Sequence, residues 1–373
     1  MGAPLSPAEA VLFRTGPNNI TVLFEATGGF DPARALRGIQ MLVQAAERFQ
    51  SPVISGLRPR FGAAGPVDLA SHVAVLNDPA ADTAQAMMNA ARKLRFDPLR
   101  PLWRIVLVNP EGGGWSGVVL HFDHAIADGT RIARLLVTRI RPGVGEVTSI
   151  DGLPVITFAD LRAQADPRLD PAPTGLCRLP FDGLSRAVPE ATGHGDALAR
   201  LGRRMLDQFD DFAGASARRK DHTAIARIEA LRNPDGGLGN HAQMQHLDLS
   251  KPSVSGESAL FRPRRTPLVE QVRMGAARLV PALLLRRMVQ AEFSLPGIVM
   301  TIVPVARKLP PIFGLPLNAT HPAAPALGRP LLSITAARTG DGFDTSITAH
   351  GPDGTAIPGL SERVAAAMVE AVQ

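Results

Sequence analysis

The stretch Val118-Val119-Leu120-His121-Phe122-Asp123-His124-Ala125-Ile126-Ala127-Asp128-Gly129 joins an apolar run to Asp-Gly. The apolar run predicts a buried strand, and Asp128-Gly129 predicts a turn leading into a helix. A histidine at a strand end is held by a rigid element, yet it borders loops that leave room for a ligand. We therefore take His124 as the candidate catalytic residue.

The chemistry of imidazole suits that position. Its ordinary pKa lies near neutrality, so His124 can take a proton from a hydroxyl and later return one. Asp128 can fix the loop by capping the next helix or by pairing with an arginine, and Gly129 lets a substrate pass close to the backbone. The string His-x-x-x-Asp-Gly is short, so a turn without function is the alternative at this point.

The neighbours of His124 have different expectations. Alternation along the strand places His121 on the same face as Val119, which predicts a core histidine with its polar atoms satisfied. Asp123 is expected either to hold the ring of His124 or to face water.

The rest of the chain alternates strands with helices, which predicts an α/β fold. Ser6-Pro7-Ala8-Glu9 predicts a helix start with a capping box, and Ser361 is expected to cap a final helix. The other helices are expected at 32–49, 83–93, 129–140, 197–217 and 268–290, and the strands at 19–25, 67–76, 102–108, 116–122, 298–305, 331–338 and 344–349.

Proline and glycine are concentrated between the two helix-and-strand regions. We therefore predict an N-terminal half over 1–165, a linker over 166–193 and a C-terminal half over 194–373.

Composition excludes several classes of protein. No apolar segment approaches the ~20 residues that a bilayer requires, since the best candidate, Leu279 to Leu285, ends at Arg286. The single Cys177 excludes an intrachain disulfide and a multi-cysteine zinc site, which fits a reducing cytoplasm, and no metal site is predicted.

The formal net charge is +6. Tyrosine is absent, aromatic residues make up 5%, and no nucleic-acid motif appears, so no nucleic-acid partner is expected. The basic residues are either solvated faces or attract phosphate groups or an anionic membrane. In the helix expected at 268–290, arginines beside leucines predict either peripheral membrane contact or a buried helix with a basic outer face.

Several motifs resemble those of the CoA-dependent acyltransferase superfamily, which includes chloramphenicol acetyltransferases and peptide-synthetase condensation domains. The run from His124 to Gly129 is similar to its His-His-x-x-x-Asp-Gly motif, and Pro101-Leu102-Trp103 to its Pro-Leu-Trp motif. Pro4-Leu5-Ser6-Pro7-Ala8-Glu9-Ala10 looks like the opening helix of the wax ester synthase/diacylglycerol acyltransferase family. The resemblance to that family covers residues 4–140 well and 263–373 more weakly.

This resemblance implies two chloramphenicol-acetyltransferase-like α/β halves, each an α+β two-layer sandwich, with a tunnel between them for acyl thioester and acceptor. It implies an O-acyltransferase that moves a fatty acyl group from acyl-CoA, as co-substrate, to a lipid or alcohol hydroxyl. His124 would be the general base on the acceptor. Asp128, Gly129 and Trp103 would support the motif structurally, and no bound cofactor is expected.

The sequence departs from the family pattern in both halves. Asp123 stands where the motif has its first histidine, the family's Asn-Asp pair is absent, and Ser-Asn-Val-Pro-Gly-Pro appears as Met300-Thr301-Ile302-Val303-Pro304-Val305. Thr301 is our candidate donor to the tetrahedral oxyanion, and an ordinary strand threonine is the alternative. The alternative function is an impaired acyltransferase fold that survives as a binding or scaffold protein.

Overall fold

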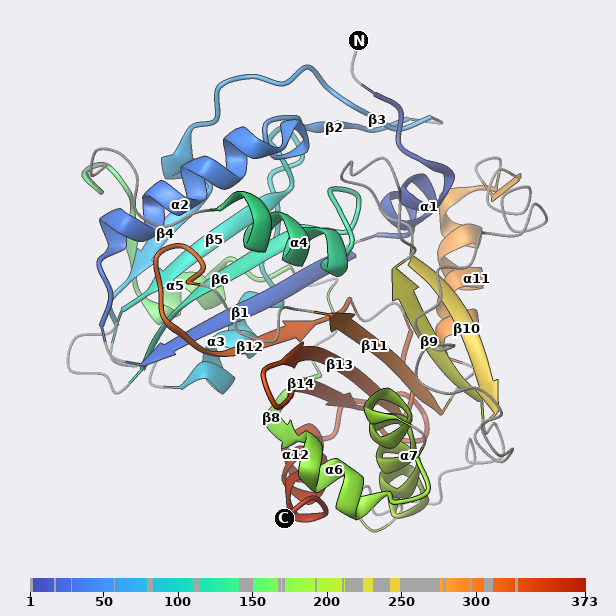
Figure 1. The fold of residues 1–373 in the computed structure, drawn as a ribbon. Helices are drawn as coiled ribbons and strands as arrows, with labels where there is room; N and C mark the ends of the chain where they lie inside the picture. Colours follow the sequence, from blue (N-terminus) through green and yellow to red (C-terminus); the bar gives the residue numbers. More distant parts are fainter. Residues whose placement is uncertain are drawn as a thin grey trace.

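The computed structural model contains two six-stranded sheets and a two-stranded ribbon (Figure 1). It describes residues 3–373 except 17, 28, 57, 79–82, 110–114, 141–149, 167, 168, 170, 171, 192, 210, 212–223, 231–241, 249–275, 278, 279, 295, 296, 305–310, 326 and 327. The ribbon pairs β2 (Val53–Ile54) with β3 (Arg60–Phe61).

The first sheet has the order β12-β1-β6-β5-β4-β7. Its strands are β1 (Asn19–Thr27), β4 (Val73–Leu76), β5 (Trp103–Val108), β6 (Trp115–Asp123), β7 (Val155–Ile156) and β12 (Leu317–Ala323). Successive side chains of a strand point to opposite sides of the sheet. Because apolar side chains lie on both sides here, helices cover both faces. On β6, Leu120 and Phe122 pack in the core beneath α2 (Pro32–Ala45) and α4 (Gly129–Arg139). Val119 packs in the opposite core, with residues of α3 (Ala84–Ala91) and α5 (Phe158–Ala163).

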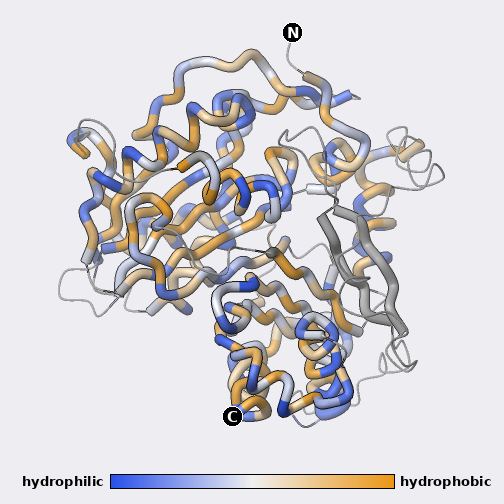
Figure 2. Tube along the Cα trace, in the orientation of Figure 1, coloured by the Kyte–Doolittle hydropathy of each residue, from blue (hydrophilic) through white to orange (hydrophobic). Residues whose placement is uncertain are grey.

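The second sheet has the order β10-β9-β11-β13-β14-β8. Its strands are β8 (Gly175–Pro180), β9 (Ala224–Ala230), β10 (Ala242–Asp248), β11 (Ile298–Pro304), β13 (Leu332–Thr339) and β14 (Gly342–Ala349). One face packs against α6 (Phe181–Ala187), α7 (His194–Asp207) and α12 (Leu360–Glu370). The other side of the sheet turns toward the first half (Figure 1). Figure 2 shows apolar residues concentrated in the strands, while the surrounding helices carry both apolar and polar residues.

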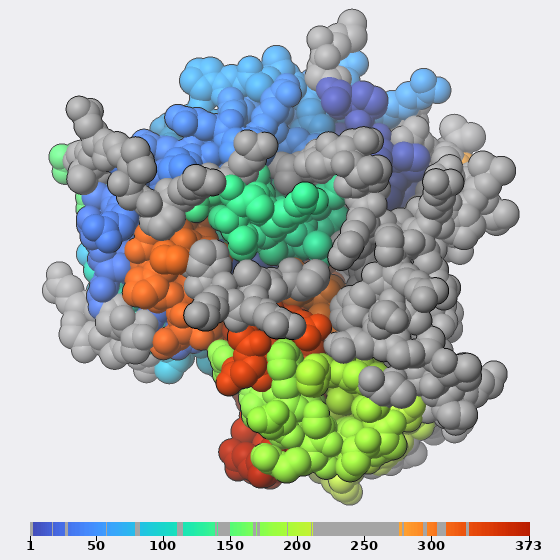
Figure 3. All heavy atoms as spheres, in the orientation of Figure 1, coloured from blue at the N-terminus to red at the C-terminus, as the bar shows by residue number. Residues whose placement is uncertain are grey.

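One strand of the C-terminal half joins the sheet of the N-terminal half. Strand β12 follows β11 in sequence, yet it pairs antiparallel with β1 at the edge of the first sheet. Just before it, Phe313 enters the first core and contacts Phe24 edge-on, with ring centroids 5.9 Å apart. Figure 3 shows orange segments of this part of the chain packed against blue segments of the N-terminal half. Residues 312–323 therefore belong spatially to the half from which the sequence boundary excluded them.

The predicted linker also needs correction. Residues 166–193 contain the edge strand β8, which pairs with β14, and the helix α6. This segment is thus partly built into the second half.

Elements with a clear local pattern lie where the sequence placed them. Helix α1 (Pro7–Thr15) has the predicted capping box: Glu9 N donates to Ser6 Oγ over 3.3 Å and Ser6 N to Glu9 Oε2 over 2.7 Å. Of the strand predicted at 67–76, only β4 and the turn η2 (Leu69–Ser71) form.

Two other expectations fare differently. Ser361 does not cap the last helix; Gly359 holds that position, and Ser361 Oγ instead accepts from Ala349 N and donates to Pro173 O. Of the basic helix predicted at 268–290, residues 268–275, 278 and 279 lie outside the described residues, and residues 282–290 form part of α11 (Ala282–Ser294).

Candidate active site

His124 follows the last residue of β6, in a turn between that strand and α4. Its backbone N donates to Asn18 O over 2.9 Å, which fixes the turn to the residue before β1. The side chain is half-buried and lines a cavity between the halves. Burial lowers the pKa of His124 to about 4, although contacts with its own backbone, with Glu9 and with the Ala127 backbone raise it in part. The imidazole is therefore neutral, and able to accept a proton, at neutral pH.

Asp128 performs both structural tasks expected of it. Its Oδ1 accepts from Arg131 N over 2.9 Å and so caps α4, and its Oδ2 lies 3.6 Å from Arg131 Nε. The carboxylate is 2% exposed. Gly129 begins the helix, where an added Cβ would lie 3.2 Å from Val303 Cγ2. The glycine thus lets α4 approach β11 of the other half closely.

Asp123 is buried and does not face water. Its Oδ1 accepts from Ala125 N over 2.8 Å, which closes the turn that carries His124. Burial raises the pKa of Asp123 to about 7, while bonds from the Ala125 and Asn18 backbones oppose that rise. The carboxyl group is thus a turn former whose ionisation is suppressed.

His121 is a core histidine, as the alternation predicted. It is fully buried, its Nδ1 lies 2.9 Å from Thr21 Oγ1, and its Nε2 lies 3.1 Å from Asn19 Nδ2 and 3.0 Å from Leu94 O. Burial lowers the pKa of His121 to about 3. The ring is thus neutral and fastened between strands.

Trp103 is also fully buried. Its Nε1 donates to Phe49 O over 2.8 Å, and its ring stacks on His72 with centroids 4.4 Å apart. Phe49 ends the short turn η1 (Glu47–Phe49) that follows α2. Trp103 therefore fixes η1 against the first sheet.

The cavity draws its walls from both halves. The first half bounds it with β1, β12, the motif turn and α4, and the second half with α11, β11 and β13. Apolar side chains dominate, among them Ile20, Val22, Phe24, Ile132, Leu136, Phe293, Val299, Ile302, Val303 and Ile312. Hydroxyls come from Thr130, Thr301, Thr320, Ser333 and Thr335. A second cavity shares Phe293, Val299, Ala324, Pro325 and Ser333 with it, and Arg92 and His350 also line it.

Thr301 and His124 lie in the wall of the same cavity. Thr301 is opposite Thr335 in the parallel β11–β13 pair. Its role as a donor remains a prediction. Sequence reasoning missed Thr320, which is 4% exposed and whose hydroxyl has no hydrogen-bond partner among the described residues. It missed Thr320 because a threonine in a polar, proline-containing segment carries no signal of burial.

No protein-family model matches this sequence, and no curated protein sequence matches it. Solved structures do match. The wax ester synthase/diacylglycerol acyltransferase from Marinobacter aquaeolei VT8 superposes with a TM-score of 0.63 at 14% identity, over 99% of this chain and 98% of that one. The first condensation domain of the CDA synthetase gives 0.58 at 16% identity, over 100% and 96%. The starter condensation domain of rhizomide synthetase in complex with C8-CoA gives 0.55 at 16%, over 100% and 95%.

The chain therefore has the α/β fold of the condensation-domain-like acyltransferases, along nearly its whole length. Its neighbours in structure are acyltransferases and condensation domains, as the motif resemblance implied. Within the described residues, no helix is long and apolar enough to cross a membrane.

Proposed function

We propose that this protein transfers a fatty acyl group from acyl-CoA to the hydroxyl of a lipid or alcohol, with His124 as general base. The observation that carries the proposal is the position of His124: a neutral, half-buried imidazole in the wall of an apolar cavity between two halves. Cavities that are mostly apolar with a few polar groups are typical binding sites for small molecules.

The chemistry follows from this arrangement. The neutral ring would take the proton of the acceptor hydroxyl as its oxygen attacks the thioester carbonyl, and would return the proton to the departing thiolate. Negative charge develops on the former carbonyl oxygen, which a hydroxyl such as that of Thr301 would stabilise. The apolar side chains of β1 and α4 would hold the acyl chain. The second cavity, which Arg92 lines, offers a guanidinium for the phosphates of CoA.

Turnover of long-chain acyl-CoA, read as release of free thiol, tests the proposal across a panel of alcohols and diacylglycerol. We expect release that depends on the acceptor and is lost in His124→Ala. Binding of acyl-CoA without release by the wild type would instead support the binding or scaffold protein, which the absence of the family's asparagine motifs favours.

A further inference from the structure

An ion pair between a buried carboxylate and a partly exposed guanidinium lies beside the turn that carries His124. Glu9 of α1 is 0% exposed, and its Oε1 lies 2.6 Å from Arg48 Nη1 in η1. The other oxygen, Oε2, accepts from Ser6 N and closes the capping box. Glu9 thus joins the start of α1 to a turn 39 residues later in the sequence.

The arginine extends this contact to the motif. Arg48 Nη1 lies 3.1 Å from Ala125 O and 3.2 Å from Ile126 O, the carbonyls of the two residues after His124. Both residues are 0% exposed, so without Arg48 these carbonyls would lose a donor away from water. The guanidinium also lies over the ring of Phe61, 4.6 Å from its centroid.

The backbone of Arg48 is held in place by the residue that follows it. Arg48 precedes Phe49, whose carbonyl accepts from Trp103 Nε1 in β5. Arg48 is therefore anchored through its neighbour to the sheet and through Glu9 to α1.

Stability alone gives little reason for such a pair. Removing the charge of Glu9 from water costs several kcal/mol, and well-packed apolar residues often replace a buried pair without loss. A guanidinium, in contrast, presents several donors in a fixed planar geometry. Arg48 Nη1 donates to Glu9 Oε1 and also lies within hydrogen-bond distance of both carbonyls of the turn.

We propose that Glu9 and Arg48 are positioning residues that hold the turn 124–126 so that the His124 ring faces the cavity. This inference rests on the proposed function for its kinetic test. The pair acts through the backbone of the turn and not by touching substrate. The charge of Glu9 also raises the pKa of His124, against the effect of burial, and so keeps the ring more basic.

The test is Arg48→Ala with and without added guanidinium ion at millimolar concentration. We expect kcat for thiol release to fall by about 10- to 100-fold, since a small misplacement of a reacting group costs that much, with KM for acyl-CoA little changed. Guanidinium should restore kcat because the Arg48 side chain is partly open to solvent, at 21% exposed. Glu9→Gln, which keeps the size and the acceptor, should give a smaller loss and serves if Arg48→Ala fails to fold.

Arg204→Ala is the matched control. Arg204 also binds a glutamate, Glu190, and a backbone carbonyl, that of Ala187, but in the C-terminal half. It should keep the wild-type kcat and show no response to guanidinium. A wild-type kcat in Arg48→Ala would overturn the positioning role. So would a result in which guanidinium restores the melting temperature of Arg48→Ala but not its kcat.

A second readout does not need turnover. Diethyl pyrocarbonate modifies accessible neutral imidazole, and mass spectrometry of the peptide with His124 gives its rate. We expect a faster rate in Arg48→Ala that guanidinium reverses, and no change in Arg204→Ala. A modification rate of His124 that is unchanged in Arg48→Ala would overturn the positioning role, whether or not the wild-type protein releases thiol. Absence of thiol release by the wild-type protein would overturn the proposed function but not the positioning role.

Discussion

At the level of single residues, burial lowers the pKa of His124, which keeps the imidazole neutral and free to accept a proton but makes it a weaker base. Replacing it with alanine should lower acyl transfer by about 100- to 10,000-fold, the usual effect of losing a general base. The side chain is half-buried at a cavity wall, so the fold should persist, which circular dichroism checks. Retention of more than half the activity would eliminate His124 as the base.

The pH profile offers an independent check on the same residue. Because the pKa of His124 is lowered to about 4, the ring stays neutral well below pH 6.5. We therefore expect kcat/KM to remain level as the pH falls from 7 to 5 and to decline only near pH 4. A decline centred at pH 6.5 would show a solvated imidazole.

Asp123 should make the protein less stable as the pH rises. Its folded pKa of about 7 lies above the ordinary 3.8, so the folded state holds the proton more tightly. The contribution is full below pH 4 and is lost as the pH rises to 7. Asp123→Asn can still accept from Ala125 N, so it should stabilise the protein above pH 7, by as much as ~4 kcal/mol, and not at pH 4. Urea unfolding at the two pH values measures the difference; a pH-independent difference contradicts it.

Thr301 belongs to the same scale. Thr301→Val keeps the shape of the side chain but removes the hydroxyl, whereas Thr301→Ser keeps the hydroxyl. If Thr301 donates to the oxyanion, the valine variant should lose about 100- to 1,000-fold in kcat and the serine variant should retain much of it. Equal kinetics in the two variants would leave Thr301 as an ordinary strand residue.

At the level of elements, the sequence predicted those whose signals are local. The capping box of α1, the strand β6 and the helix start at Asp128 each follow from a few adjacent residues. Strands β8 and β12 escaped prediction because each contains a proline and intersperses its apolar residues with glycine or polar residues, and so resembles a loop. Both are edge strands, where a missing donor is tolerated.

The candidate site shows the same limit. His124, Asp128 and Gly129 lie in one short run, so the sequence brought them together. The ion pair between Glu9 and Arg48 depends on the packing of α1 against η1, which no local pattern reveals.

Helix α11 carries the prediction for membranes. Leu284 and Met288 are one turn apart and are 52% and 54% exposed, and Arg287 beside them is exposed. If this surface binds anionic lipid, co-sedimentation with vesicles should rise with their anionic fraction and fall in the double variant Leu284→Ser, Met288→Ser. Leu99→Ser is the control, since Leu99 is 84% exposed in the other half. Sedimentation that ignores anionic lipid would remove this interpretation.

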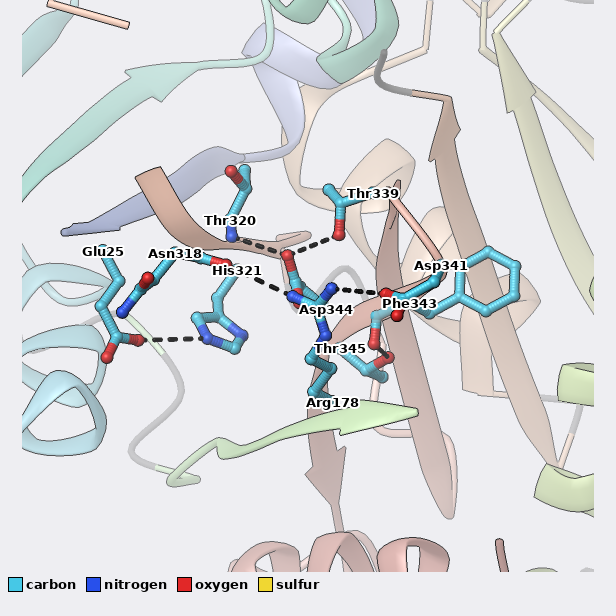
Figure 4. Close-up of polar contacts among 10 residues, drawn as sticks. All are labelled: Glu25, Arg178, Asn318, Thr320, His321, Thr339, Asp341, Phe343, Asp344 and Thr345. Carbon is cyan, nitrogen blue, oxygen red and sulfur yellow. Dashed lines mark hydrogen bonds and ion pairs between the residues drawn. The ribbon is translucent and has the colours of Figure 1, made fainter. Parts of the chain in front are cut away.

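At the level of the whole molecule, the exchange of β12 makes the halves depend on each other. The connection is polar as well as apolar (Figure 4). Asp344 of β14 is fully buried; its Oδ2 accepts from Thr320 N of β12 over 2.9 Å and from Thr339 Oγ1 over 2.7 Å. Its Oδ1 accepts from Arg178 Nη1 over 3.0 Å. One carboxylate of the second sheet thus holds the backbone of a strand in the first.

We therefore expect the two halves to unfold together, and replacing Asp344 tests this. Asp344→Ala leaves the buried Thr320 N without its acceptor and should destabilise the protein by about 3 kcal/mol. The two tryptophans, Trp103 and Trp115, both lie in the first sheet, so their fluorescence reports the first half alone, whereas circular dichroism reports both. We expect the two urea midpoints to fall together.

Asp341→Ala is the control: Asp341 also pairs with Arg178, at 2.8 Å, but is 85% exposed, so its loss should cost no more than about 1 kcal/mol. A fluorescence midpoint that stays at the wild-type value in Asp344→Ala, while circular dichroism shifts, would mean that the halves unfold independently despite the exchanged strand.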